Sequence, residues 1–428
     1  MNLYEHQKKG LEVTEGLNHV AYYWDMGLGK TFVGSEKMSQ LGAKVNLIIC
    51  QKSKVQDWVD HFETYYPKHC ALDLTNANAL NMFIHVTTFP VVGIINYDLA
   101  WRRKELLQLK DFTLLLDESS MIQNEKAKRT KFIMKLKAKN VILLSGTPTG
   151  GKYERLWSQM RLLGWNISKE LYWNQFVITK QLDLVSGRSI PIVVGYKNVD
   201  RLKRKMSEHG CQFLKTSEVF DDMPKQNFQK ISVPTTSDYR KFKKTGIVTI
   251  DDPYDVENGY TLVGDTSLTK MLYERQLCGI YSQDKLKAFA DLLDSTEDRL
   301  IVFYNFTEEL NRLMAEAMNQ GRPVSVVSGF RKTLDEYENK SNSVTFVQYQ
   351  AGAMGLNLQK ANKIIYYSLP LSSELFEQSK KRIHRIGQER PCFYYLLICK
   401  GSIEESILRT LKQRKDYTNR LFEKEQES

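Results

Sequence analysis

A glycine-rich run near the amino terminus has the residue types needed to bind a nucleoside triphosphate. Asp25-Met26-Gly27-Leu28-Gly29-Lys30-Thr31 directly follows the apolar run Val20-Ala21-Tyr22-Tyr23, as in a strand that leads through glycines into a helix. Backbone N–H groups of such a loop face the phosphates, Lys30 would reach the β and γ phosphates, and Thr31 would hold Mg²⁺. Trp24 stands where the simple GxxxxGK[ST] pattern has its first glycine, so the motif needs a second element to support it.

Two adjacent carboxylates provide that second element. Asp117 and Glu118 follow the apolar run Leu114-Leu115-Leu116, at the carboxyl end of a predicted strand. Asp117 would anchor Mg²⁺ through water, and Glu118 would orient or activate the attacking water. An acidic pair that stands alone after a strand is more often a helix cap. When a phosphate loop precedes the pair in the chain, the pair instead indicates nucleotide hydrolysis.

Two arginines in the second half of the chain are spaced to act on a phosphate. Arg382 and Arg385 lie in the run Gln378 to Gln388, and the i, i+3 spacing predicts that both guanidiniums share one helix face. A planar fork suits the charge that develops on a γ-phosphate. A solvated basic helix is the alternative. Because the Asp117 site has no arginine of its own, the second half is predicted to supply an arginine finger.

Short apolar runs that alternate with helix-like stretches would position these groups. Strand, helix, strand at this spacing predicts βαβ units and parallel sheets covered on both faces. The fold class is therefore α/β in both halves. The predicted strands are residues 20–23, 45–50, 91–95, 112–116 and 141–144, and then 299–304, 324–327, 344–347, 363–367 and 393–398.

The composition of the intervening stretches divides the chain further. Residues 1–150 would form the first core and 280–428 the second, with a surface helix over 403–422. Residues 151–232 begin with a stretch rich in Trp, Leu, Lys and Arg, which predicts a helical extension of the first core. Residues 233–279 are polar and carry Pro253 and several glycines, which predicts a linker.

The charge balance of the 428 residues suits a polyanionic partner. Lys plus Arg number 61 and Asp plus Glu 50, a net charge of +11, although a merely soluble basic surface would have the same balance. No apolar run approaches the roughly 18 residues of a membrane span, and the first residues lack a signal-peptide core, so membrane and exported proteins are not expected. Six scattered cysteines form no CxxC pair, so neither a disulfide framework nor a structural zinc site is expected. This cysteine pattern fits a protein of the reducing cytoplasm.

Taken in order along nearly the whole chain, the motifs resemble those of the SWI/SNF-like branch of the superfamily 2 helicase-related ATPases, in a compact form like those found in bacteriophages. The matching segments are Leu3 to Gln7, Asp25 to Thr31, Ile48 to Ser53, Asn96 to Asp98, Asp117 to Asn124, Leu144 to Pro148, Ile301 to Tyr304, Gly352 to Leu358 and Gln378 to Gln388. His384-Arg385-Ile386-Gly387-Gln388 is especially specific to this branch.

The resemblance implies two RecA-like domains with ATP and Mg²⁺ between them. It assigns catalysis to Lys30, Asp117, Glu118, Gln378, Arg382 and Arg385. It assigns nucleotide binding to Gln7, which would read the adenine, to Met26, Gly27, Leu28, Gly29, Lys30 and Thr31, and to Gly355. Thr31 and Asp117 would hold the metal. DNA contacts are expected from Ser53, Lys54, Asn96, Tyr97, Thr149 and Asn357.

Some positions depart from the family pattern. Ser119-Ser120 replaces Ala-His, so the histidine that usually couples the acidic motif to the threonine-proline motif is absent, and Ser120 can make only a shorter hydrogen bond. Lys381 replaces an Asp and Gln51 a Pro. The second half leaves little room for the large helical insertion of chromatin remodellers, so nucleosome work is not expected.

The resemblance implies a monomeric motor that hydrolyses ATP and moves on double-stranded DNA by gripping its backbone. Branched or single-stranded DNA remains open as a further partner. One alternative is a strand-separating helicase on forked DNA or RNA, for which no wedge is evident, although residues 245–266, with Tyr254 and Tyr260, could contain one. The other alternative is an ATP-gated binding module.

Overall fold

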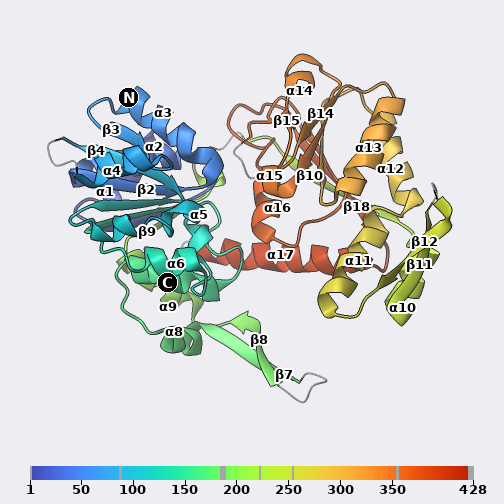
Figure 1. Cartoon of the computed structure of the whole chain (residues 1–428), viewed down its shortest axis with the longest axis horizontal. Helices are drawn as coiled ribbons and strands as arrows, with labels where there is room; N and C mark the ends of the chain where they lie inside the picture. The colour runs from blue at the N-terminus through green and yellow to red at the C-terminus, as the bar shows by residue number, and fades with distance from the viewer. Residues whose placement is uncertain are drawn as a thin grey trace. The chain divides into compact units, whose positions relative to one another are not determined.

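The computed structural model of the chain describes residues 2–85, 89–183, 189–220, 223–252, 255–352 and 356–422. Contacts divide the chain into two units (Figure 1). Unit 1 comprises Met1–Asp221 and Arg414–Ser428, and unit 2 comprises Asp222–Gln413. The predicted segments placed the corresponding division at residue 232 or later. Among the described helices, none combines the length and the apolar character needed to cross a bilayer.

The core of unit 1 is a parallel sheet in the strand order β3-β4-β2-β5-β6-β1-β9. The strands are β1 (His19–Trp24), β2 (Val45–Cys50), β3 (Cys70–Asp73), β4 (Val91–Asn96), β5 (Thr113–Asp117), β6 (Asn140–Leu144) and β9 (Cys211–Leu214). All five strands predicted for the first half are present. β3 and β9 were not predicted.

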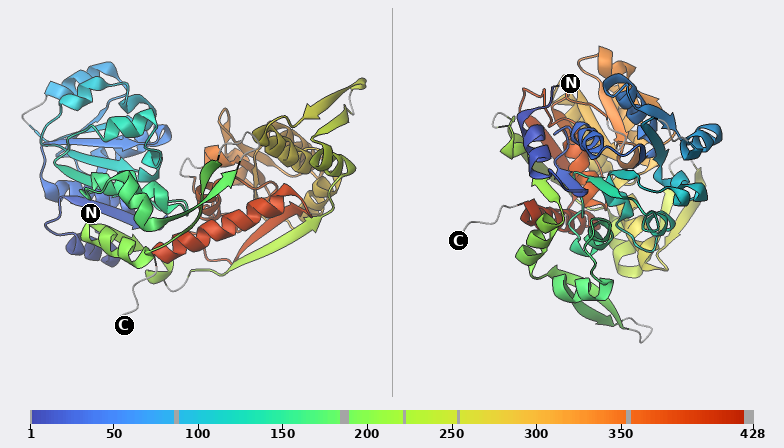
Figure 2. Two further views of the ribbon diagram at one scale, coloured as in Figure 1. Left: turned by 90° about the horizontal axis from the view of Figure 1, so that it is seen from below. Right: turned by 90° about the vertical axis from the view of Figure 1, so that its left-hand side faces the viewer.

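Helices cover both faces of this sheet (Figure 2). Each strand alternates its side chains between two apolar clusters, one on each face. In β1, for example, Val20, Tyr22 and Trp24 pack on one side, and Ala21 and Tyr23 on the other. The first side is covered by α1 (Glu5–Val13), α2 (Lys30–Leu41) and α3 (Val55–Tyr65). The second is covered by α4 (Ala77–His85), α6 (Lys128–Ile133), α7 (Trp157–Leu162), α8 (Lys169–Phe176) and α9 (Val199–Glu208).

The region predicted to be a helical extension also contains a β-hairpin. Its strands are β7 (Val177–Asp183) and β8 (Ser189–Tyr196), which pair antiparallel and project from the rest of unit 1 (Figure 1). The register brings five exposed apolar side chains to one face of the hairpin. They are Ile178, Leu182, Ile190, Ile192 and Val194.

Unit 2 is built on a second sheet in the order β10-β18-β17-β13-β16-β14-β15, parallel except for the β14–β15 pair. The strands are β10 (Gln226–Val233), β13 (Leu300–Tyr304), β14 (Val324–Val327), β15 (Lys332–Thr333), β16 (Val344–Gln348), β17 (Lys363–Tyr366) and β18 (Cys392–Cys399). All five strands predicted for the second half are present. The two RecA-like α/β domains expected from the sequence are confirmed.

Helices cover both faces of this sheet too. One face packs against α12 (Gln283–Asp294) and α13 (Thr307–Asn319). The other packs against α14 (Asp335–Asn339), α15 (Tyr349–Gly352), α16 (Ser373–Lys380) and α17 (Ile403–Phe422). The predicted helix over 403–422 therefore has these bounds in the structure, and its residues Ile407, Leu408 and Leu411 are buried.

The stretch predicted to be a linker is folded. It forms α10 (Ser237–Thr245), the antiparallel strands β11 (Ile247–Asp252) and β12 (Asp255–Val263), and α11 (Ser267–Gly279). Phe242, Val248 and Leu277 belong to a small apolar cluster of their own. The polar composition misled the prediction because most of these elements bury only one side. Tyr254, named as part of a candidate wedge, lies outside the described residues.

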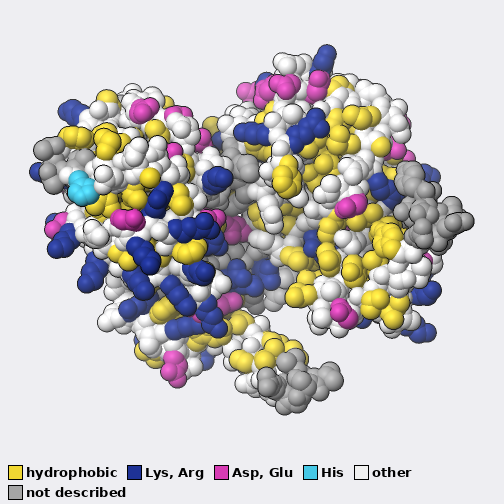
Figure 3. Space-filling model, in the orientation of Figure 1, with side chains coloured by type: hydrophobic (Ala, Val, Ile, Leu, Met, Phe, Trp, Pro, Cys, Tyr) yellow, Lys and Arg dark blue, Asp and Glu magenta, His cyan; other side chains and the backbone are white. Residues whose placement is uncertain are grey.

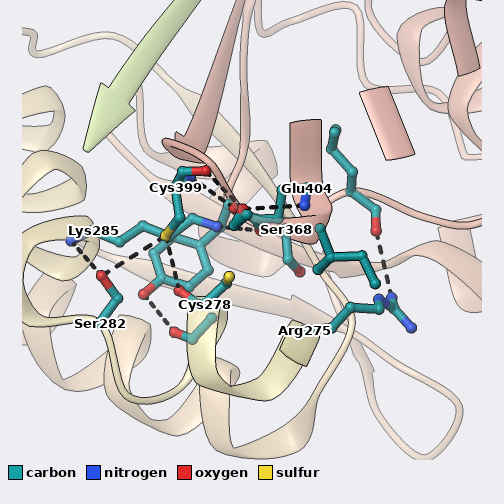
Figure 4. A network of polar contacts seen from close by, with 12 residues as sticks. Arg275, Cys278, Ser282, Lys285, Ser368, Cys399 and Glu404 are labelled. Carbon is teal, nitrogen blue, oxygen red and sulfur yellow. Dashed lines mark hydrogen bonds and ion pairs between the residues drawn. The ribbon is translucent and has the colours of Figure 1, made fainter. Parts of the chain in front are cut away.

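A buried ion pair joins α12 to α17 in unit 2 (Figure 4). Lys285 Nζ lies 2.5 Å from Glu404 Oε1, and their side chains are 0% and 3% exposed. The second oxygen, Glu404 Oε2, accepts from the Cys399 N–H at 3.0 Å. Burial acts to lower the pKa of Lys285, but the Glu404 carboxylate outweighs it and holds that pKa above its usual value. Lys285 is therefore charged, and Glu404 is its partner inside the protein.

We expect Glu404→Gln to destabilise unit 2 by about 3–5 kcal/mol, because it leaves Lys285 charged and buried without its partner. Urea unfolding followed by circular dichroism should then separate into two transitions. All six tryptophans lie in unit 1, so the tryptophan fluorescence transition should stay in place. Glu405→Gln is the matched control, since its partner Lys230 is exposed and such a pair is worth about 1 kcal/mol or less. Equal losses in the two variants would contradict the prediction.

Candidate active site

The predicted nucleotide-binding residues of unit 1 lie at one edge of its sheet. The loop that carries Lys30 follows β1, and the acidic pair Asp117-Glu118 begins at the end of β5. The loop beginning at Ser145 follows β6, which lies between these two strands. The carboxyl ends of parallel strands meet at the same edge, where ligands of open α/β sheets bind. The structure therefore brings the phosphate loop and the acidic pair of unit 1 to the same edge of the sheet.

Two glycines shape the phosphate loop. Gly27 has φ +91° and Gly29 has φ +72°, values that only glycine adopts without strain. A Cβ on Gly29 would also lie 2.1 Å from Gln7 Nε2. Gly29 precedes the first residue of α2, so the loop presents its backbone N–H groups at the amino end of a 12-residue helix.

Lys30 and Asp25 hold this loop from both ends. Lys30 Nζ donates to the carbonyls of Trp24 at 2.9 Å and Asp25 at 3.1 Å. Asp25 Oδ2 accepts from the Thr216 N–H at 3.0 Å, and Thr216 begins the short 3₁₀ helix η5 (Thr216–Glu218) after β9. Thr216 is a supporting residue that the motifs did not reveal.

Gln7, which is predicted to read the adenine, contacts the phosphate loop. Its Oε1 accepts from the Tyr4 N–H at 2.9 Å, and its Nε2 donates to the carbonyls of Gly29 at 3.3 Å and Leu28 at 3.4 Å. The side chain is buried. Gln7 therefore joins the start of α1 to the loop.

The acidic pair is half-buried and held by hydrogen bonds. Asp117 Oδ2 accepts from Trp58 Nε1 at 2.8 Å, and Glu118 Oε1 accepts from the hydroxyls of Ser145 at 2.6 Å and Ser120 at 2.9 Å. Burial raises the pKa of both carboxyls, and the Ser145 and Ser120 hydrogen bonds oppose the rise at Glu118. Glu118 also has the left-handed φ of +56°, which turns its side chain toward the Ser145 loop.

Three residues predicted to contact DNA have buried side chains. Tyr97 begins the short helix α5 (Tyr97–Ala100), is 1% exposed, and its hydroxyl donates to the Asp117 carbonyl at 3.0 Å. Asn96 and Thr149 are also buried, and Thr149 Oγ1 accepts from the Gly151 N–H at 3.0 Å. Ser53 and Lys54, in the 3₁₀ helix η1 (Lys52–Lys54), remain accessible. In this structure Tyr97 supports the acidic loop.

In unit 2, the prediction that Arg382 and Arg385 share one helix face is wrong. α16 ends at Lys380, and the backbone then tightens, with the Arg382 N–H donating to the Ser379 carbonyl at 3.2 Å. The arginines therefore lie in successive turns. Arg382 Nη1 donates to the Leu356 carbonyl at 3.4 Å, and Arg385 Nη1 donates to Asn357 Oδ1.

Both arginines are thus held against the segment that begins at Leu356. Gln378, on α16, is buried, and its Oε1 has no hydrogen-bond partner among the described residues. Asn357, predicted to contact DNA, is exposed. Gly355, predicted to contact nucleotide, lies outside the described residues.

Exposed lysines and arginines gather on unit 1 over α5 and α6 (Figure 3). Trp101, just after α5, links the two elements, because the Arg102 guanidinium and the Lys128 ammonium lie 5.2 and 5.1 Å from its ring centroid. This basic surface consists of Arg102, Lys104, Lys126, Lys128, Lys131, Lys135 and Lys137. It concentrates positive charge in the way that a polyanion-binding surface requires.

One group of buried side chains in the described part of the chain has donor atoms close enough to ligate a metal. Cys278, Cys399 and Glu404 have ligand atoms within 4.8 Å of one another. The Lys285 ammonium already neutralises the Glu404 carboxylate there (Figure 4). The cluster is therefore satisfied as a packed polar network of unit 2.

The sheets and the loop at the carboxyl edge of unit 1 define a nucleotide-binding ATPase core of the RecA type. Residues 6–280 match the SNF2-related domain, and residues 284–387 match the helicase conserved C-terminal domain. The chain therefore belongs to the SNF2-related family of helicase superfamily 2 ATPases.

Known relatives align with nearly the whole chain. An uncharacterized ATP-dependent helicase of Mycoplasma genitalium is 24% identical over 97% of this chain, and a DNA repair and recombination protein of Saccharomyces cerevisiae is 26% identical over 93%. The alignments cover 42% and 44% of those proteins, so the chain spans less than half the length of the curated relatives it matches. A solved structure of the Sulfolobus solfataricus SWI2/SNF2 ATPase core in complex with double-stranded DNA is 18% identical, with a TM-score of 0.45 and coverage of 98% of this chain and 92% of that one.

Proposed function

We propose that this protein hydrolyses ATP and uses the cycle to move along double-stranded DNA. One observation carries the proposal. A glycine loop with Lys30 and a half-buried acidic pair meet at the carboxyl edge of the same parallel sheet, which is the arrangement that phosphoryl transfer to water needs.

Each residue of unit 1 has a task in this proposal. Gln7 reads the base, the loop from Met26 to Gly29 cradles the phosphates with its N–H groups, and Lys30 leaves its backbone carbonyls to reach the β and γ phosphates. Glu118 orients the attacking water and accepts its proton. The hydroxyl of Thr31 and the carboxylate of Asp117 are hard oxygen donors, which fit Mg²⁺. When bound, the ion would neutralise developing phosphate charge.

Unit 2 completes the reaction in this proposal. Arg382 and Arg385 neutralise charge on the γ-phosphate after the units close, and Gln378 positions the attacking water. The partner is a duplex gripped by its phosphates, a role that the net charge of +11 and the basic surface support. Ser53, Lys54 and Asn357 are the predicted contacts that remain accessible.

We expect double-stranded DNA to raise the ATP turnover of the purified protein more than single-stranded DNA, forked DNA or RNA do. Side-by-side steady-state rates measure this. Lys30→Ala removes the charge that reaches the phosphates, so it should lose turnover by orders of magnitude and keep the fold. A Lys30→Ala protein with turnover near that of the unmodified chain would contradict the site. An unmodified protein that responds only to RNA would contradict the track.

A strand-separating helicase is the second candidate, and the projecting β7–β8 hairpin favours it. Its exposed apolar face has the chemistry of an element that enters between base pairs. Displacement of a triplex strand without opening of a fork would support translocation on duplex DNA. Opening of the fork would support strand separation. An ATPase that does neither would be the ATP-gated binding module.

The setting of the protein is part of the same proposal. The short spacing between the motifs of unit 2 supports a compact, phage-type member. Action as a monomer is a further part of the proposal. Its six cysteines are free, which supports work in a reducing cytoplasm.

A further inference from the structure

The acidic loop and the loop after β6 are joined by a ring of hydrogen bonds. On one side, the Ser145 hydroxyl donates to Glu118 Oε1 at 2.6 Å. On the other side, the Ser119 hydroxyl donates to Gln159 Oε1 at 2.8 Å, and Gln159 Nε2 donates to the Pro148 carbonyl at 2.8 Å. Gln159, on α7, therefore closes the ring between the two loops.

The amide of Gln159 is held in one orientation. A carbonyl can only accept, so the Pro148 oxygen requires the amide nitrogen on its side. The amide oxygen then faces two hydroxyl donors, Ser119 at 2.8 Å and Tyr23 of β1 at 3.0 Å. Gln159 is 0% exposed, so bulk water does not reach its amide to replace these partners. Any displacement of Ser119 must move the amide or leave a buried donor unpaired, which is costly.

We propose that Gln159 is a positioning residue that transmits the state of Glu118 to the segment Ser145–Thr149, and through it couples ATP hydrolysis to DNA. It would take the place of the histidine that the acidic motif lacks. The Ser120 hydroxyl donates to Glu118 at 2.9 Å. The inference rests on the proposed function, since it specifies how the ATP site and the DNA track communicate.

A second glutamine keeps the Pro148 loop folded without Gln159. Gln123 Nε2 donates to the same Pro148 carbonyl at 3.1 Å, and its Oε1 accepts from Arg155 Nη1 at 3.0 Å. Replacing Gln159 thus leaves the carbonyl with a donor. The link from Ser119 is lost while the loop retains its anchor, so coupling can be separated from folding.

The test is hydrogen exchange of peptides covering residues 145–150, with and without a non-hydrolysable ATP analogue. In the unmodified protein, the analogue should slow exchange in this segment. In Gln159→Leu, the analogue should still bind with unchanged affinity, but the response of the segment should shrink severalfold, because only the Ser145–Glu118 hydrogen bond then joins the two loops. DNA stimulation of turnover should fall by about tenfold, a typical coupling between two sites, while turnover without DNA changes little.

The matched control is Asn140→Leu. Asn140 is also buried, and its amide donates to Thr113 Oγ1 at 3.1 Å. Both residues lie at the amino ends of their strands, β6 and β5, whereas the predicted site lies at the carboxyl ends. This variant should lose stability and keep both responses. If Gln159→Leu fails to fold, Ser119→Ala removes the same link with a smaller change and decides the question.

The outcomes separate the inference from the proposed function. A segment whose response to the analogue in Gln159→Leu, or in Ser119→Ala, equals that of the unmodified protein overturns the role of Gln159. If DNA does not change the turnover of the unmodified protein, the proposed function is refuted. The exchange experiment still tests the role of Gln159 in that case, because it uses no DNA.

Discussion

Glu118→Gln should bind ATP normally and lower its turnover by about 10³-fold, within the range for losing a general base. Glutamine has nearly the same shape and can still accept from the Ser145 and Ser120 hydroxyls. It cannot take a proton from water. The variant should therefore stall with ATP bound and dissociate slowly from DNA. Single-turnover hydrolysis and the lifetime of the DNA complex measure the two effects.

Two control variants sharpen this result. Asp117→Asn removes the other carboxylate, which is predicted to hold the metal, so its main defect should be a higher Mg²⁺ requirement. Glu36→Gln removes a carboxylate of α2 whose partner is the Tyr66 hydroxyl at 3.1 Å, and it should leave turnover unchanged. If Glu118→Gln and Asp117→Asn showed one and the same loss of nucleotide binding, the division of roles would be wrong.

Arg385→Ala should lower ATP hydrolysis by about 10³-fold or more, the range for losing an arginine finger, and leave ATP binding nearly unchanged. Unit 1 carries the phosphate loop and Gln7, whereas Arg385 belongs to unit 2, so in the proposed mechanism Arg385 acts on the nucleotide through closure of the two units. DNA should also cease to stimulate turnover, because the stimulation is attributed to DNA favouring closure. Nucleotide affinity and turnover with and without duplex DNA measure the split.

Arg385→Lys should rescue poorly, because an ammonium lacks the planar fork of the guanidinium. Arg390→Ala is the matched control in the same segment, since Arg390 is exposed and its Nη2 donates to the Lys360 carbonyl at 2.8 Å. It should retain turnover and stimulation. An Arg385→Ala protein whose residual activity still rises several-fold with duplex DNA would show that closure does not couple the track to the chemistry.

The core strands of both sheets could be predicted because each is a short apolar run buried on both faces. β3 was missed because its four residues are only half-buried, so no continuous apolar run marks it. The β7–β8 hairpin was missed for a related reason, since its stability comes from pairing and it exposes apolar side chains to solvent. Pro191 inside β8 also reads against a central strand, yet a two-stranded hairpin has free edges that accept it.

The chemical residues of unit 1 could be predicted because each motif is contiguous in sequence. The partners that hold them could not. Thr216 lies 191 residues from Asp25, and Trp58 lies 59 residues from Asp117, so no local pattern records these pairs. Tyr97 was assigned to DNA by its motif alone, and only the fold shows that its hydroxyl meets the acidic loop. The helix expected at Arg382 failed because the chain changes to tighter turns just after Lys380.

The left-handed backbone at Glu118 sets catalysis against thermal robustness. A residue other than glycine or asparagine in this conformation costs about 1–3 kcal/mol. The packing around β5 and β6 offsets that cost. Glycine at this position would relax the backbone and remove the proposed general base in a single step. Laboratory evolution guided by heat resistance alone would therefore drift toward an inert protein at this residue, so any such selection needs ATP turnover as a second criterion.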